Sequence, residues 1–174
     1  MANHSVTVSQ LNALDRAGFT AALGHLFEHS PWVADETWPQ RPFRDDAQLH
    51  AALSTTMRAA PKEKQLALIR AHPDLAGRLA QQNQLTAEST REQASAGLNR
   101  MSDAELAEFQ KNNAAYLARL GFPFIICARL NNRATILAAM QSRLNNSPDA
   151  EFHTALSEIE KIARLRLDDL LNTG

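Results

Sequence analysis

Apolar side chains recur along this chain every three or four residues, which is the period of an amphipathic helix. The stretches with this period are 19–27, 49–57, 66–70, 106–120, 136–144 and 152–170. No stretch combines the apolar-polar alternation of a strand with flanking turns. The pattern therefore predicts an all-α fold.

Residue types that favour helix starts punctuate these stretches. The expected N-terminal positions are Asp15, Pro61, Thr86, Ser102 and Ser147-Pro148. Ser102 and Glu105 have the spacing of a capping box, and the helix that starts at Thr86 is expected to run through Leu98. No repeat or long linker divides the chain. Residues 1–174 are therefore expected to form a single-domain compact helical bundle of about eight to ten helices.

A histidine interrupts the helical pattern at residues 71–77. The residue before a proline is disfavoured in the helical region, so one helix should stop near His72 and a turn should open at Pro73. A short helical piece is then expected at residues 75–82. A break of this kind aims a side chain outward, and an imidazole with a near-neutral pKa can exchange protons. His72 is thus a candidate site residue, with a loop histidine at a helix boundary as the alternative.

The helix after Thr86 carries a polar face made by Ser89, Glu92 and Gln93, which share one side at helical spacing. A hydroxyl, a carboxylate and an amide on one face could hold a polar heterocycle, and the carboxylate could orient an imidazole. The alternative is local, because Ser89 and Glu92 also have the spacing of a capping box.

Pro123 precedes an apolar stretch, residues 124–128, that is expected to begin a helix with unpaired backbone N–H groups. Such a terminus can receive anions or carbonyl oxygens, although these residues could also simply pack in the core. Cys127 is expected to be a small buried side chain rather than a nucleophile. Arg129 could pair locally or reach a ligand carboxylate.

Two further features concern charged side chains on or near apolar stripes. His25, Glu28 and His29 match the H-x-x-E-H pattern, which would place two imidazole zinc ligands and a glutamate base on one helix. Arg166 falls on or beside the apolar stripe of the last helix, which suggests a buried ion pair near the site. A zinc hydrolase is therefore one alternative function, and a helical interaction module without chemistry is another.

Charge and composition argue against nucleic acid and membrane as binding partners. The chain has 18 basic and 19 acidic residues and a formal net charge of -1. It has no basic stripe for nucleic acid, and no polybasic end or long apolar run for a membrane. A small neutral or anionic metabolite fits better as the ligand.

Cysteine use and the chain ends bear on location. Cys127 is the single cysteine, which excludes an internal disulfide and a cysteine-based zinc site and suits a reducing compartment. The N-terminal residues lack the regions of a secretory signal, and the C-terminal Leu-Asn-Thr-Gly is not a peroxisomal address. A cytoplasmic location is expected.

Four motifs in order along the chain resemble those of the 2-oxo-4-hydroxy-4-carboxy-5-ureidoimidazoline (OHCU) decarboxylases, the last enzymes of urate breakdown to (S)-allantoin. The motifs are Phe-Glu-His-Ser-Pro-Trp-Val, His-Pro-Asp-Leu-Ala-Gly, Ser-Thr-Arg-Glu-Gln-Ala-Ser-Ala-Gly-Leu and Gly-Phe-Pro-Phe-Ile-Ile-Cys-Ala-Arg. The likeness runs from Leu11 to Leu171 and includes the last helix. One departure is Ala118-Arg119-Leu120, where members often carry a Lys-Phe pair.

The resemblance implies an all-helical homodimer that acts on a small ureidoimidazoline without metal or organic cofactor. The absence of a peroxisomal address suggests a bacterial, cytoplasmic member. It implies that His72 is the catalytic acid/base and that Glu92 is its carboxylate partner. The residues it places along the substrate pocket are Pro73, Ser89, Thr90, Arg91, Glu92, Gln93, Phe124, Ile125, Ile126, Cys127 and Ala128. No organic cofactor is needed, because the substrate's own C=N can accept the electron pair left by CO2.

Overall fold

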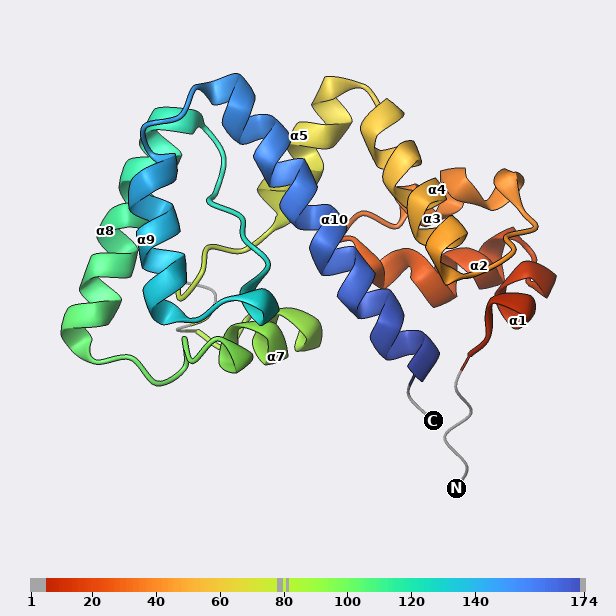
Figure 1. Cartoon of the computed structure of the whole chain (residues 1–174), viewed down its shortest axis with the longest axis horizontal. Coiled ribbons are helices and arrows are strands. Elements are labelled where there is room, and N and C mark those ends of the chain that lie inside the picture. The colour runs from red at the N-terminus through yellow and green to blue at the C-terminus, as the bar shows by residue number, and fades with distance from the viewer. Residues whose placement is uncertain (1–5, 78–79, 81, 173–174) are drawn as a thin grey trace. The chain divides into compact units, whose positions relative to one another are not determined.

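The computed structural model describes residues 6–77, 80 and 82–172 of the 174-residue chain. Within these residues the chain forms nine α-helices and three short 3-10 helices, and no strand (Figure 1). The predicted all-α fold is confirmed. The described residues form two compact units, which are 6–71 with 160–172 and 72–159.

The first unit contains the N-terminal helices and the C-terminal part of the last helix. Its elements are α1 (Val8–Ala13), α2 (Arg16–Leu23), η1 (Gly24–Leu26), α3 (Trp32–Thr37), η2 (Trp38–Gln40), α4 (Asp46–Ala59), α5 (Lys62–Ala71) and α10 (Pro148–Asn172) from residue 160 onward. Its apolar stripes are buried as expected, and α2 and α4 bury Phe19, Leu23, Leu49 and Leu53 completely. Phe19 also stacks on Phe43 at 6.2 Å between ring centroids.

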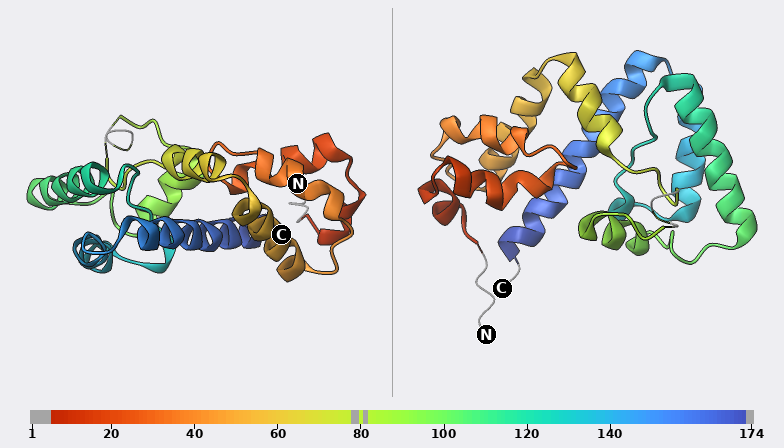
Figure 2. Two further views of the ribbon diagram at one scale, coloured as in Figure 1. Left: turned by 90° about the horizontal axis from the view of Figure 1, so that it is seen from above. Right: turned by 180° about the vertical axis from the view of Figure 1, so that it is seen from behind.

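The second unit contains the remaining helices and one extended segment. Its elements are α7 (Ala87–Ser95), α8 (Asp103–Leu120), η3 (Ala128–Leu130), α9 (Arg133–Arg143) and α10 up to residue 159. Helices α8 and α9 lie side by side, as the views in Figure 2 also show. Phe109 and Tyr116 of α8 and Ile136 and Met140 of α9 are buried.

The helix caps read from the sequence are largely confirmed. Asp15 and Thr86 accept the backbone N–H of the third helical residue, and Ser102 forms the full capping box with Glu105. Helix α7 ends at Ser95 rather than Leu98, because Gly97 adopts a left-handed conformation at φ 79°. Helix α1 was not expected from the sequence, and a capping box between Thr7 and Gln10 starts it.

Two expectations about short segments need correction. Residues 124–127 are extended rather than helical, and the next helical turn, η3, begins only at Ala128. Leu75 and Ala76 form a turn rather than a helix, whereas Ala80 is helical as expected. Residues 78, 79 and 81 of the expected helical piece lie outside the described residues. In the described part of the chain, no helix combines the length and apolar character needed to cross a membrane.

Candidate functional site

His72 follows directly on the last residue of α5 and is the first residue of the second unit. The expected helix break before Pro73 is present, since α5 ends at Ala71. The expectation that the side chain points outward is wrong, because His72 is only 8% exposed. The imidazole is therefore held in a protein environment with little access to bulk water.

The loop after His72 is a tight turn that leaves no space for a side chain at Gly77. The backbone N–H of Gly77 donates to the carbonyl oxygen of Asp74 at 3.2 Å, and a Cβ on Gly77 would lie 2.5 Å from that of Asp74. Ala76 has a φ of 50°, a left-handed conformation that is uncommon for a residue with a side chain. Burial raises the pKa of the Asp74 carboxyl above its ordinary value. The need for glycine at position 77 and the left-handed Ala76 thus define the geometry of this turn.

Helix α7 holds this turn through one side chain. The side-chain oxygen of Gln93 accepts the backbone N–H of Ala76 at 2.9 Å. Gln93 is 6% exposed, so the bond is shielded from water. A second helix contributes from the other side of the peptide, since Nδ2 of Asn113 in α8 donates to the carbonyl oxygen of Leu75 at 2.8 Å.

The five residues from Ser89 to Gln93 divide between two faces of α7. Ser89 and Gln93 are buried and Glu92 is half-buried, whereas the side chains of Thr90 and Arg91 are exposed. Thr90 donates to the carbonyl oxygen of Thr86, and Arg91 approaches Glu88 at 3.8 Å. The structure brings the first three together on one face and places the last two side chains elsewhere.

The capping alternative for Ser89 is wrong. Thr86 is the N-cap of α7, and its hydroxyl accepts the backbone N–H of Ser89 at 3.2 Å. Ser89 therefore lies inside the first turn, and its hydroxyl belongs to the buried face of the helix.

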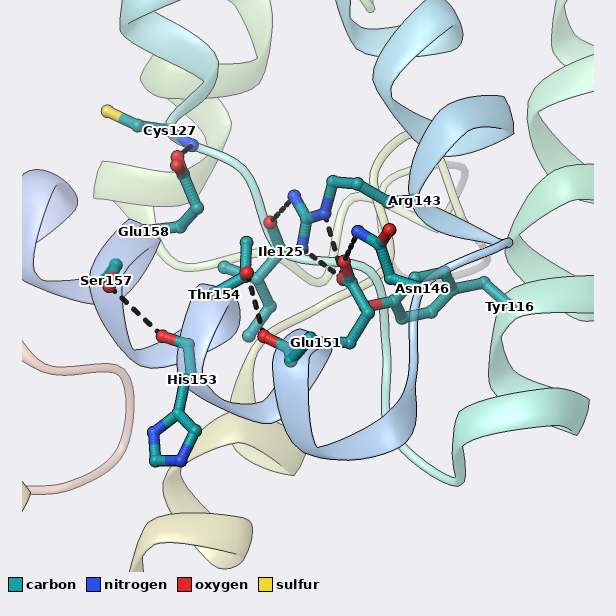
Figure 3. A network of polar contacts seen from close by, with 11 residues as sticks. Tyr116, Ile125, Cys127, Arg143, Asn146, Glu151, His153, Thr154, Ser157 and Glu158 are labelled. Carbon is teal, nitrogen blue, oxygen red and sulfur yellow. Dashed lines mark hydrogen bonds and ion pairs between the residues drawn. The ribbon is translucent and has the colours of Figure 1, made fainter.

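The extended segment before η3 is fixed by side chains from two other helices (Figure 3). Arg143 in α9 donates through Nη1 to the carbonyl oxygen of Ile125 at 2.8 Å, and Glu158 in α10 accepts the backbone N–H of Cys127 at 2.8 Å. These bonds hold the segment extended, which explains why the expected helix does not form there. Among the described residues, no acceptor takes the backbone N–H groups of Phe124, Ile125 or Ile126.

Arg143 is held in turn by a buried glutamate. Its Nε donates to Glu151 at 2.9 Å, and its Nη2 lies 2.8 Å from the same carboxylate as an ion-pair contact without directed hydrogen-bond geometry. The Tyr116 hydroxyl and the Asn146 amide also donate to Glu151. The guanidinium stacks over Phe124, with 4.3 Å from its central carbon to the ring centroid. Tyr116, Arg143 and Glu151 thus anchor the segment to α8, α9 and α10.

The pKa directions of this network follow from its geometry. Burial alone would raise the pKa of Glu151, but hydrogen bonds from Arg143, Tyr116 and Asn146 hold it below its ordinary value. Burial and the neighbouring Glu151 charge raise the pKa of Tyr116, so the phenol stays protonated and remains a donor.

Cys127 links the extended segment to α7. Burial raises the pKa of its thiol, and the negative charges of Glu158 and Glu92 raise it further. The charge of Glu92 acts at this thiol, and α7 packs against η3. Helix α7 therefore contacts two parts of the candidate site. It binds the turn after His72 through Gln93, and it packs near Glu92 against the end of the 124–128 segment. The thiol is a poor nucleophile in this setting, as the sequence suggested.

The zinc alternative is contradicted by the backbone. Helix α2 ends at Leu23, and His29 has a φ of 47°, so His25 and His29 do not share a helix face. Both histidines are exposed, whereas Glu28 is buried and paired with Arg166 at 3.0 Å. No group of three potential metal ligands occurs among the described residues. The buried ion pair expected for Arg166 is present, and Arg129 is exposed in η3.

Comparison with known proteins gives the family. The family model described as OHCU decarboxylase matches residues 12–168. The chain belongs to this family. An OHCU decarboxylase of Halalkalicoccus jeotgali is 44% identical over 95% of this chain and 92% of its own length. An OHCU decarboxylase of Mus musculus is 42% identical, over 93% and 91%.

Two solved structures are similar to this member of the OHCU decarboxylase family. A crystal structure of (S)-allantoin synthase has a TM-score of 0.78 and 32% identity, and it covers 96% of this chain. This chain spans 54% of that protein, or about half its length. An OHCU decarboxylase crystallised in the presence of (S)-allantoin has a TM-score of 0.68 at 24% identity, which supports the fold.

Several residues of the candidate site were not predicted from the sequence. Asn113 was visible as a polar residue on an apolar stripe. Arg143 and Glu151 look like ordinary charges that complement helix dipoles, at the end of α9 and the start of α10, and nothing local distinguishes them from surface residues. Glu158 falls on the last helix without a distinguishing neighbour.

Proposed function

We propose that this protein is a carboxy-lyase that converts 2-oxo-4-hydroxy-4-carboxy-5-ureidoimidazoline to (S)-allantoin in urate breakdown. The observation that carries the proposal is the match to the OHCU decarboxylase family over residues 12–168. An OHCU decarboxylase is also 44% identical over 95% of the chain. The similarity to (S)-allantoin synthase supports the same product.

His72 is the acid/base of this reaction in our proposal, and Glu92 is its carboxylate partner. The firmly held turn after His72 supports the assignment, because a proton donor must keep its orientation during the reaction. The half-buried position of Glu92 on the inner face of α7 is consistent with its role. An imidazole can both take up a proton and return it.

The substrate pocket we propose comprises Pro73, Ser89 to Gln93 and Phe124 to Ala128. Ser89 and Gln93 supply buried polar groups, whereas Thr90 and Arg91 can contribute to it only through their backbone or a changed rotamer. The backbone N–H groups of Ile125 and Ile126, which no acceptor in the described chain occupies, suit the ring and ureido oxygens.

The chemistry needs positioning and proton transfer. The bond from the ring carbon to the carboxylate breaks, CO2 leaves, and the electron pair passes to the adjacent C=N, whose nitrogen takes a proton. The resulting enol then loses its hydroxyl proton to His72 while the neighbouring ring carbon gains a proton, which leaves the carbonyl and the C–H of allantoin. Delivery of that proton to one face sets the S configuration.

We further propose that residues 1–174 act as one domain, because the family model runs through both compact units without interruption. The homodimer and the cytoplasmic location implied by the family resemblance belong to the same proposal. A gel-filtration measurement with light scattering would test the dimer.

The deciding experiment adds the purified protein to freshly generated urate-oxidation product and follows optical rotation. We expect rapid formation of (S)-allantoin alone, whereas the spontaneous reaction gives a racemate. His72→Asn is the matched control and should form allantoin about 10² to 10⁴-fold more slowly than the wild-type protein. Racemic product at the spontaneous rate with the wild-type protein would reject the proposed function.

A ligand measurement separates this function from that of an interaction module. Allantoin at 100 times its dissociation constant should raise the free energy of unfolding by about 2.7 kcal/mol. The absence of any thermal shift with allantoin and related ureidohydantoins would favour an interaction module.

A further inference from the structure

One peptide group in the turn after His72 is held at both ends by side-chain amides. The carbonyl oxygen of Leu75 accepts Nδ2 of Asn113 at 2.8 Å, and the N–H of Ala76, in the same peptide, donates to Gln93 at 2.9 Å. The two amides come from α8 and α7. Such a peptide cannot rotate without breaking one bond or the other.

Asn113 occupies an unusual position for an amide. It lies on the buried face of α8 between Phe109 and Tyr116 and is 6% exposed. Its Oδ1 is buried, and no donor among the described residues reaches it. Burying an amide with an unmet acceptor costs stability, so this position is not explained by packing alone. The hydrogen bond to Leu75 is the contact that an amide provides and a leucine would lose.

The held peptide is close in sequence to His72, and the intervening residues transmit its orientation. Pro73 has a fixed φ, and the Asp74–Gly77 turn has no room for a side chain at Gly77. Rotation of the Leu75–Ala76 peptide would release the left-handed conformation of Ala76 and alter the path of the chain back to His72.

We propose that Asn113 is a positioning residue for His72, which acts through the Leu75–Ala76 peptide that it holds together with Gln93. The proposal rests on the proposed function for its kinetic consequence. It adds a residue that the proposed substrate pocket does not include, and it explains why an amide is buried in an apolar stripe.

The kinetic test compares Asn113→Leu with Asn112→Leu. The control changes the same residue type one position away, where the side-chain amide donates to the carbonyl oxygen of Glu108 in the same helix. Because a misplacement of about 1 Å can cost about 100-fold in rate, Asn113→Leu should lower kcat by about 10- to 100-fold with KM changed less than twofold. Asn112→Leu should keep the wild-type kcat. A wild-type kcat in folded Asn113→Leu would overturn the proposal.

A second background distinguishes positioning from general damage. In a His72→Asn protein, the residual rate should be unaffected by Asn113→Leu, because the group being positioned is gone. An equal loss in both backgrounds would mean a structural role and would overturn the proposal. Should Asn113→Leu fail to fold, Asn113→Ser and Asn113→Ala replace it. The serine retains a donor and should keep a higher kcat, and equal rates would count against the proposal.

Hydrogen exchange measured by NMR tests the held peptide without any turnover. The Ala76 amide should be protected in the wild-type protein and should exchange at least about tenfold faster in Asn113→Leu, while the Tyr116 amide in α8 is unchanged. Unchanged exchange at Ala76 would overturn the proposal. If the wild-type protein makes no allantoin, the proposed function fails, and exchange at Ala76 still decides whether Asn113 holds the turn.

Discussion

The backbone around His72 restrains the imidazole more tightly than the position of this residue before a proline suggests. It precedes a proline, a turn closed by Gly77 and a peptide bonded at both ends. A group fixed in this way loses little further freedom when the substrate binds, so more of the binding free energy can lower the reaction barrier. Burial of the side chain adds to this restraint.

The first prediction concerns the proposed acid/base pair. His72→Asn should lower kcat by about 10² to 10⁴-fold, which is the usual contribution of a positioned acid or base. Asparagine is chosen rather than alanine because His72 is buried and a large cavity would confuse the result. Glu92→Gln should cause a similar loss, and both proteins should melt within a few degrees of the wild type.

The double variant tests whether the two residues act as a unit. His72→Asn combined with Glu92→Gln should be barely slower than either single variant, since groups that act together are not additive. Losses that multiply, or near-normal turnover in His72→Asn, would remove the pair from the mechanism.

A second prediction concerns Gly77. A methyl group there would lie 2.5 Å from Cβ of Asp74, so Gly77→Ala should open the turn and reduce stability by about 1 to 3 kcal/mol. We expect kcat to fall with it, because the same turn fixes His72. Urea denaturation and turnover should be measured beside Gly18→Ala, whose new Cβ would have as its nearest neighbours the Asp15 side chain at 3.0 Å and the Leu14 side chain at 3.4 Å. Full activity in Gly77→Ala would show that the turn geometry does not matter.

Among the structural elements, the extended segment before η3 shows where the sequence is insufficient. Local rules placed the caps of α2, α7 and α8 correctly, because each depends on residues within one turn. The segment after Pro123 depends instead on Arg143 and Glu158, which lie 18 and 31 residues away from the backbone groups they bind. Contacts of that range have no local signal, so a helix was expected where none forms.

A third prediction tests the anchor of this segment. Glu151→Gln removes the charge that balances the mostly buried Arg143 and should cost about 3 to 5 kcal/mol in the free energy of unfolding. Glu108→Gln is the control, since Glu108 is exposed and its carboxylate accepts from the exposed Gln141 amide. It should change stability by less than about 0.5 kcal/mol. Equal stability of the two variants would contradict a buried, charge-dependent anchor.

The same carboxylate predicts a dependence of stability on pH. Its pKa in the folded protein lies below the ordinary value of 4.5, so its stabilising effect is fully present above that value and is lost as pH falls through the folded pKa. The difference in unfolding free energy between wild type and Glu151→Gln should therefore be constant from neutral pH to about pH 5 and shrink below pH 4.5. A difference that is independent of pH down to pH 3 would show that the pKa of Glu151 is not involved.

At the scale of the whole molecule, the helical class and most helices follow from periodicity, while the grouping of helices does not. The first unit joins residues 6–71 to 160–172, and the sequence gives no sign of this beyond a charged residue on the stripe of the last helix. That residue, Arg166, pairs with Glu28, and each is almost fully buried. A charge on an apolar stripe indicated a buried partner but could not identify it.

The fourth prediction concerns this pair, which joins two ends of the chain within the first unit. Arg166→Met should cost about 3 to 5 kcal/mol because Glu28 is left charged and buried, whereas Arg166→Met with Glu28→Leu should recover most of that loss. Arg16→Met is the control: its pair with Asp35 is exposed and should be worth less than about 1 kcal/mol. Urea denaturation of the four proteins measures the differences. A double variant as unstable as Arg166→Met would mean that the pair is not what stabilises the fold here.

The discontinuous first unit has a consequence for the order of events on the ribosome. Domains usually fold from the N-terminal side as synthesis proceeds. Here the residues that complete the first unit, with Arg166 among them, are made after the whole of 72–159. Until they emerge, the ion pair between Glu28 and Arg166 cannot form. In the nascent chain, residues 72–159 should therefore become resistant to protease before residues 6–71, which is the reverse of the usual order from the N-terminus.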